Sequence, residues 1–229
     1  MNDHRARRLH IGSGDVPLAG WTNIDLLPYP NVDLIADVTR PLPFENVQFV
    51  FAEHFIEHLA FDDAAAFLRE CRRILSPQGV LRLSTPNLDW VWSTQYHCGE
   101  WTTEDAAIQE CFNLNRGFYG WGHRFLYNSQ TLTALLHSAG FRTVELVTYG
   151  ESRHPELRDL ERHERSQDTP ELPHVIIAEA EGIGTTLDLA VPYAVSYRRD
   201  TNLRWHALQY AALGFLRLGT RFLRAIGLK

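Results

Sequence analysis

A glycine turn followed by an acidic residue is the feature of this sequence with the clearest chemical use. Apolar residues at positions 9–11 lead into Gly12, Ser13 and Gly14, and a second apolar stretch ends at Asp25. A turn without bulky side chains lets the backbone approach a ligand closely, and a carboxylate at the next strand end can accept hydrogen bonds from ribose hydroxyls. This order of residues therefore predicts a site for a nucleotide-like ligand.

Three further apolar stretches also end in polar residues. They end at Asp37, at Glu53 and at Thr85. Each stretch is typical of a strand whose carboxyl end carries a polar group, and open parallel sheets bind their ligands outside those ends. We expect these polar residues to lie along one edge of a single sheet.

The order of these segments resembles the class I S-adenosylmethionine (SAM) methyltransferases, in particular the compact bacterial type-11 domain. The resemblance covers residues 8–146 and implies an α/β fold whose sheet is doubly wound, mostly parallel, seven-stranded and Rossmann-like, with an antiparallel hairpin at its end. It also implies that SAM is the cofactor and that a methyl group passes from it to an acceptor. The segments that carry the resemblance are residues 9–14, 23–26, 36–38, 42–44, 53–59 and 75–81.

The resemblance also assigns residues to the parts of SAM. Asp25 would accept hydrogen bonds from the ribose hydroxyls, Asp37 and Val38 would lie at the adenine, and Glu53 or His54 would lie nearest the methionine part. The implied cofactor site consists of Ile11, Gly12, Ser13, Gly14, Asp25, Leu26, Asp37, Val38, Glu53 and His54.

The spacing between the glycine turn and the acidic residues is short. Asp25 follows Gly12 by 13 positions, against about 20 in the dinucleotide fingerprint, and Asp37 follows Asp25 by 12. Because a parallel crossover needs about a dozen residues or more, we expect the first two crossovers to have stunted helices or none. Pro17 stands where the fingerprint has its third glycine, which argues against an NAD-dependent dehydrogenase.

Two helices have clear boundary signals. Asp62 is expected to cap a helix that runs to Leu75, and Asn128 is expected to cap a helix that Gly140 ends. Both positions precede apolar residues at helical spacing.

The segments after residue 85 are expected to differ in structure from one another. Residues 141–147 and 174–180 are expected to form the last two strands, with a short helix near residues 155–165 in a charged, solvated stretch between them. Residues 86–127 are irregular in pattern and rich in aromatic residues. We interpret them as a substrate-facing insertion, whose aromatic side chains form either a local core or an acceptor pocket.

Several histidines could transfer a proton or bind a metal. We favour His123 as the catalytic base and name His54 as the second candidate, because residues 120–124 place an imidazole among glycines and aromatic residues. A structural role for His123 is the alternative. His54, Glu57 and His58 also fit the His-x-x-Glu-His pattern of zinc hydrolases, with both histidines as ligands on one helix. No third ligand is evident, so we predict no metal site.

The formal net charge of −6 is unevenly distributed. Residues 198–229 hold seven basic residues against one acidic residue, so the residues before them carry −12. An acidic body argues against nucleic acid as a partner. From residue 202 onward, apolar residues recur at three- and four-residue steps. They predict a basic amphipathic helix over residues 202–229, for which docking on its own body, homodimer formation and peripheral membrane contact are all open.

These features predict two parts in the 229-residue chain. Residues 1–182 would form the SAM-binding domain, and residues 183–229 a linker and the C-terminal helix. The sequence has no 18-residue apolar stretch, and its first residues do not resemble a signal peptide, so we expect a cytoplasmic protein. The expected acceptor is a small molecule or a glycan-like compound. The main alternative is a SAM-binding protein without catalysis that is recruited to a partner or a membrane.

Overall fold

The computed structural model describes residues 7–162, 171–187 and 192–201. It divides into two compact units, residues 1–187 and residues 188–229. In the second unit the described element is the helix α5 (Pro192–Thr201). The predicted amphipathic helix over residues 202–229 lies outside the described residues. In the part of the chain that the structure describes, no helix is both long enough and apolar enough to cross a bilayer.

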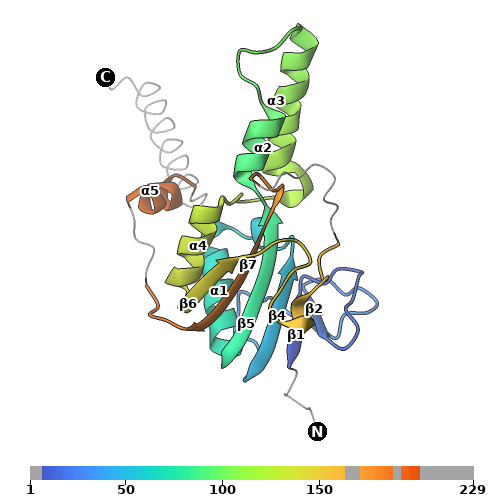
Figure 1. Ribbon diagram of the computed structural model, residues 1–229, viewed down its shortest axis with the longest axis vertical. Coiled ribbons are helices and arrows are strands. Elements are labelled where there is room, and N and C mark those ends of the chain that lie inside the picture. The colour runs from blue at the N-terminus through green and yellow to red at the C-terminus, as the bar shows by residue number, and fades with distance from the viewer. Residues whose placement is uncertain (1–6, 163–170, 188–191, 202–229) are drawn as a thin grey trace, which may run out of the picture. The chain divides into compact units, whose positions relative to one another are not determined.

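The first unit is built on one seven-stranded sheet, which confirms the predicted fold class (Figure 1). The strand order is β3-β2-β1-β4-β5-β7-β6, in which β7 runs antiparallel to both of its neighbours and the other pairs are parallel. The strands are β1 (Arg8–Ile11), β2 (Thr22–Asp25), β3 (Leu34–Ile35), β4 (Val47–Glu53), β5 (Leu75–Pro86), β6 (Phe141–Leu146) and β7 (Val175–Ile183).

Helices α1 (Phe61–Ile74) and α4 (Ser129–Ser138) cover one face of the sheet (Figure 1). Asn128 caps α4 as predicted, since its side chain accepts a hydrogen bond from the Thr131 amide. The prediction that Asp62 caps α1 is wrong. The cap position is Ala60, and Asp62 lies inside the first turn. An acidic residue in the first turn interacts favourably with the helix dipole. Asp62 therefore does mark the start of the helix, but it lies two residues after the cap position.

The other face of the sheet is covered by irregular chain. The segments that join β1 to β2 and β2 to β3 contain no helix, as their length predicted. In place of a helix, residues 148–162 lie on this face, and Leu157 packs with Trp21 and Phe51 in a buried apolar cluster. The helix predicted near residues 155–165 is a single 3-10 turn, η3 (Pro155–Leu157), with residues 163–165 outside the described residues.

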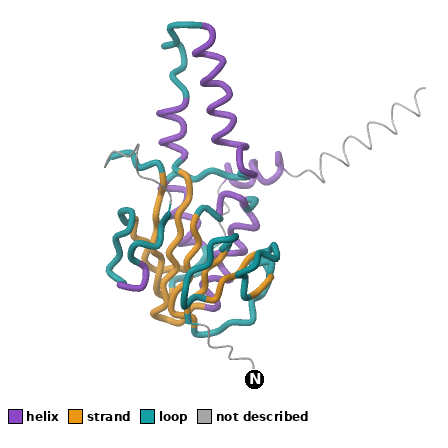
Figure 2. The backbone as a smooth tube through the Cα atoms, turned by 90° about the vertical axis from the view of Figure 1, so that its right-hand side faces the viewer, coloured by secondary structure: helices purple, strands orange, loops and turns teal. Residues whose placement is uncertain are grey.

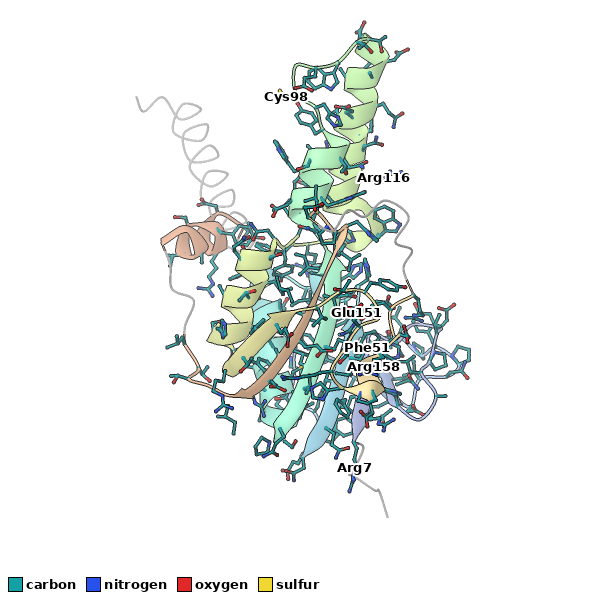
Figure 3. The ribbon with its side chains drawn as sticks, viewed as in Figure 1. Arg7, Phe51, Cys98, Arg116, Glu151 and Arg158 are labelled. Atoms are coloured by element: carbon teal, nitrogen blue, oxygen red, sulfur yellow. The ribbon has the colours of Figure 1, made fainter. Side chains whose placement is uncertain are left out.

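A buried ion network joins residues 148–162, which we call the covering segment, to the sheet. Arg82 on β5 is fully buried and donates hydrogen bonds to Glu161 at 2.6 Å, to Glu179 of β7 at 2.6 Å and to the carbonyl oxygen of Glu151 at 2.8 Å. Arg82 pairs in register with Phe51, and Figure 3 labels Phe51 on the sheet and Glu151 in the segment. The two carboxylates neutralise the guanidinium, which could not otherwise be buried at tolerable cost.

Residues 86–127 form a helical hairpin, so the prediction of an irregular segment is wrong. Its helices are α2 (Leu88–Gln95) and α3 (Glu104–Tyr119), and the 3-10 turn η2 (Gly120–Gly122) follows α3. The hairpin projects from the edge of the sheet at which β5 ends (Figures 1 and 2). In it the Tyr96 ring lies 5.6 Å from the Trp92 ring and 5.6 Å from the Trp101 ring, measured between centroids. These three rings form a small, partly exposed aromatic cluster.

Candidate functional site

The glycine turn after β1 lies at the carboxyl edge of the sheet. The amides of Gly12 and Ser13 both donate to the Ile24 carbonyl oxygen of β2, at 2.9 and 3.2 Å. Gly12 and Gly14 have φ values of 65° and 55°, a region that residues with a side chain rarely occupy. A Cβ on Gly12 would also stand 2.4 Å from Cδ2 of Phe55. The turn therefore requires glycine at position 12 for its conformation and for its close contact with the chain after β4.

Asp25 lies at the end of β2, next to this turn. Its Oδ2 accepts a hydrogen bond from the Gly14 amide and its Oδ1 accepts one from the Leu27 amide, each at 2.9 Å. An ionised carboxylate can accept about four hydrogen bonds, so about two positions remain for a ligand. The two backbone hydrogen bonds fix the carboxylate against the glycine turn. This carboxylate is the group that we predict to accept hydrogen bonds from the ribose hydroxyls. Ile11 is buried at the end of β1, and Leu26 exposes 65% of its surface beside Asp25.

Asp37 lies two residues past the end of the short strand β3. It is exposed, and its Oδ1 accepts hydrogen bonds from the amide and the hydroxyl of Thr39, at 3.0 and 2.7 Å. These bonds hold the pKa of the Asp37 carboxyl below its usual value. The Ala36 amide donates to the carbonyl oxygen of Asp25 at 2.9 Å, which keeps the two acidic residues on neighbouring strand ends. The following residue, Val38, is buried.

Glu53 ends β4 and pairs with an arginine that sequence reasoning missed. The Arg162 amide donates to Oε1 at 2.7 Å and its Nε donates to Oε2 at 2.9 Å, while Nη1 reaches the Val16 carbonyl oxygen at 3.2 Å. Arg162 therefore joins the covering segment to β4 and to the chain after the glycine turn. The sequence interpretation placed this arginine on a solvated surface, because nothing local marks a partner 109 residues away.

His54 does not belong to a helix that could present two zinc ligands. Its φ is 45°, its amide donates to the Ser84 carbonyl oxygen at 3.0 Å, and only residues 56–58 form the 3-10 turn η1 (Ile56–His58). The His54 Nδ1 atom lies 3.3 Å from Oε1 of Glu57. The geometry of the His-x-x-Glu-His helix in zinc hydrolases is therefore absent from this segment.

Glu57, His58 and His123 instead converge from two separate segments. The carbonyl oxygen of Glu57 accepts hydrogen bonds from the amides of Arg124 and Phe125, at 2.7 and 3.2 Å, which brings the chain after η2 against η1. The rings of His58 and His123 lie 5.3 Å apart between centroids. One donor atom from each of the three residues lies within 4.8 Å of the other two. His123 thus lies close to Glu57 and His58, neighbours that the sequence did not indicate.

Exposed aromatic residues precede His123 in the chain. Tyr119 and Trp121 expose 75% and 72% of their surface, and the Trp121 ring lies 5.7 Å from the His123 ring. The guanidinium carbon of Arg116 stands 5.8 Å from the centre of the Trp121 ring, and Figure 3 shows Arg116 at the end of the hairpin nearer the sheet. The foot of the hairpin therefore offers exposed rings beside the polar strand ends.

A cavity of about 930 Å³ opens at the opposite end of the strands. Residues that line it include Arg7, Phe44, Arg73 and Gln78. We assign the site to the carboxyl edge despite this cavity, because ligands of open parallel sheets bind outside the carboxyl ends and the glycine turn lies there.

Comparison with known proteins shows that most residues at this edge belong to a segment that matches one protein family. Residues 9–146 match the family model described as "Methyltransferase domain". The chain belongs to this methyltransferase-domain family. The matched region holds β1 to β6, and thus the glycine turn, Asp25 and the Glu57 cluster, whereas Arg162 and β7 lie beyond it.

Relatives of this methyltransferase domain occur in mycobacteria. A probable S-adenosylmethionine-dependent methyltransferase of Mycobacterium tuberculosis is 34% identical over 138 residues, which cover 59% of this chain and 42% of that protein. A protein of the same description from Mycolicibacterium smegmatis is 44% identical over 63 residues, 26% of this chain and 23% of that protein. The matches span less than half of these relatives. A SAM-dependent methyltransferase structure from Archaeoglobus fulgidus aligns with a TM-score of 0.48 and 17% identity, over 77% of this chain and 86% of that one.

Proposed function

We propose that this methyltransferase domain transfers a methyl group from SAM to a small-molecule or glycan-like acceptor. The observation that carries the proposal is the Asp25 carboxylate, held by the Gly14 amide beside the glycine turn in a chain of this family. This arrangement fits the adenosine part of SAM, since the turn permits close approach of the backbone and the carboxylate keeps acceptor positions for two hydroxyls.

The neighbouring residues fit the remaining parts of SAM. Asp37 and Val38 follow the next strand end, where the adenine would lie. The Ser13 side chain is buried, and its Oγ forms no hydrogen bond within the described residues, so it is available to a ligand that enters the turn. Glu53 and Arg162 carry opposite charges beside the turn and suit the ammonium and carboxylate groups of the methionine part. When bound, SAM supplies an electrophilic methyl group.

The acceptor side is proposed to lie at the foot of the hairpin. Methyl transfer needs the acceptor atom in line with the methyl group, and a proton must leave when the acceptor is a hydroxyl. The exposed rings of Tyr119 and Trp121 suit the apolar face of a sugar or of a planar small molecule. His123 and His54 stay the predicted proton acceptors, and both lie beside Glu57.

The proposal is tested in two steps with the full chain. Calorimetry measures SAM binding, and release of S-adenosylhomocysteine is then measured over a panel of hydroxylated small molecules and oligosaccharides. We expect SAM binding and acceptor-dependent release, which Trp121→Ala weakens and Trp92→Ala, on the same hairpin, leaves unchanged. Failure to bind SAM would refute the proposal. Binding without release for any acceptor would favour the non-catalytic SAM-binding protein.

For the C-terminal segment we propose homodimer formation. The support is the sequence alone, since residues 202–229 combine apolar residues at helical spacing with basic residues. The chain ending at residue 201 should bind SAM unchanged and should be a monomer in sedimentation, where the full chain is a dimer. A monomeric full chain that binds anionic vesicles would favour the membrane alternative.

A further inference from the structure

We propose that Glu57, His58 and His123 form a binding site for a divalent transition-metal ion, with Zn²⁺ as the best-suited ion. The three donor atoms lie within 4.8 Å of one another, although the residues come from two segments far apart in the sequence. This inference has a test separate from that of the proposed function, because metal binding can be measured without SAM or an acceptor, but it assigns His123 to the metal and leaves His54 as the predicted proton acceptor.

The donor set suits zinc. Two imidazole nitrogens and one carboxylate oxygen are donors that Zn²⁺ accepts at about 2.0–2.2 Å, and a site with three protein ligands keeps a fourth position open. Tetrahedral bonds of that length place the donor atoms about 3.3 Å apart. His58 and His123 are half-buried, and the proposed site requires their side chains to rotate until the donors reach this spacing.

The hydrogen bond of His123 is of a kind that metal-binding histidines make. Its Nδ1 lies 2.9 Å from the Gly117 carbonyl oxygen. A carbonyl oxygen only accepts hydrogen bonds, so Nδ1 carries the proton and the lone pair of the ring is on Nε2. Metal-binding histidines commonly donate their second nitrogen to a carbonyl or carboxylate oxygen in this way, which fixes both the ring and its tautomer.

Glu57 is a buried carboxylate that a cation would neutralise. Its side chain is fully buried, and Oε2 accepts a hydrogen bond from the Thr85 hydroxyl at 3.0 Å. Oε1 forms no hydrogen bond in the part of the chain that the structure describes, and its contact with His54 Nδ1 is 3.3 Å long. Burying a carboxylate that has one oxygen without a hydrogen bond is costly unless a positive charge compensates it. A metal ion at Oε1 would supply that charge.

The position of the site gives the ion two effects. The ion would join η1, after β4, to the foot of the hairpin at η2, so it should stabilise the fold. It would also lie beside the polar strand ends at which the acceptor is proposed to bind. His123 would then coordinate the ion through Nε2 and would not be the proton acceptor.

The test uses the untagged full chain after dialysis against a chelator. We expect Zn²⁺ to bind at one ion per chain in calorimetry and to raise the melting temperature, and Co²⁺ to give the visible absorption of a tetrahedral site. His123→Ala and His58→Ala should each weaken Zn²⁺ binding by at least about 100-fold, since even indirect partners of a ligand contribute about 10–100-fold. The matched control is His97→Ala, which removes an exposed histidine that is paired with Glu110 on the hairpin, and it should bind as the native chain does.

Two results would overturn the proposal. One is the absence of stoichiometric Zn²⁺ binding by the folded native chain. The other is unchanged affinity in both histidine variants, which would place any bound ion elsewhere. Glu57→Gln keeps the size of the side chain and removes its charge, so its loss of binding in a protein with native circular dichroism would separate coordination from misfolding.

Discussion

Replacement of Asp25 by alanine should weaken SAM binding while leaving the protein folded. The Asp25 carboxylate accepts hydrogen bonds from the amides of Gly14 and Leu27, and it keeps acceptor positions for two ribose hydroxyls. Two bonds to a charged acceptor contribute about 2–4 kcal/mol together. We therefore expect a dissociation constant about 30–700 times higher, at about 1.4 kcal/mol for each factor of ten. Asp25→Asn keeps one acceptor oxygen and should fall between the native chain and the alanine variant.

Folding stability must be measured beside affinity, because the same carboxylate also fixes the glycine turn. Asp25 is only half-buried, so water can replace it at the two amides, and we expect a loss of about 1 kcal/mol in urea unfolding. Asp63→Ala, which removes an exposed carboxylate from α1, is the control and should bind SAM as the native chain does. An alanine variant of Asp25 that is folded and binds SAM within threefold of the native affinity would refute the assignment of this residue.

Three further predictions concern buried groups. Arg82→Met leaves two buried carboxylates without their cation and should lower the free energy of unfolding by about 3–5 kcal/mol in urea, and a loss below 1 kcal/mol would contradict the role of the ion network. Burial holds the pKa of His10 below its usual value, so the unfolded chain takes up this proton first and the native protein loses stability as the pH falls below about 6.5. His10→Gln should lose less stability between pH 7 and pH 5, and equal losses would count against the buried neutral imidazole. Burial also raises the pKa of the Cys71 thiol, so a thiol reagent should modify the exposed Cys98 and Cys111 in the native protein, and Cys71 only after unfolding.

The sheet and its glycine turn could be predicted because their signals are local. Each strand end is marked by its own apolar stretch and polar stop, and the short crossovers follow from residue counts alone. No such local pattern identifies the partners of Glu53 and Glu57. Arg162 and His123 reach them across 109 and 66 positions of the chain, through a covering segment and a turn whose paths depend on the completed sheet.

The hairpin was missed for a physical reason. A helix shows apolar periodicity when one of its faces is buried, but α3 has no buried residue and α2 buries only Val91. Its boundaries were nevertheless encoded, since the side chains of Asn87 and Thr103 cap the two helices. For Asp62 the opposite error arose, because acidic residues are favoured both at the cap and in the first turn, and the sequence alone does not separate the two positions.

The place of β7 in the sheet has a consequence for how the chain folds during synthesis. This strand is the last of the seven to leave the ribosome, yet it lies between β5 and β6. Until it arrives, β6 has no strand to pair with and β5 presents an open edge to other chains. A nascent chain that ends at residue 146, where the family match also ends, therefore carries an incomplete sheet. Sheet completion is a late, long-range event, and an aggregation-prone edge persists until Val175–Ile183 has been inserted.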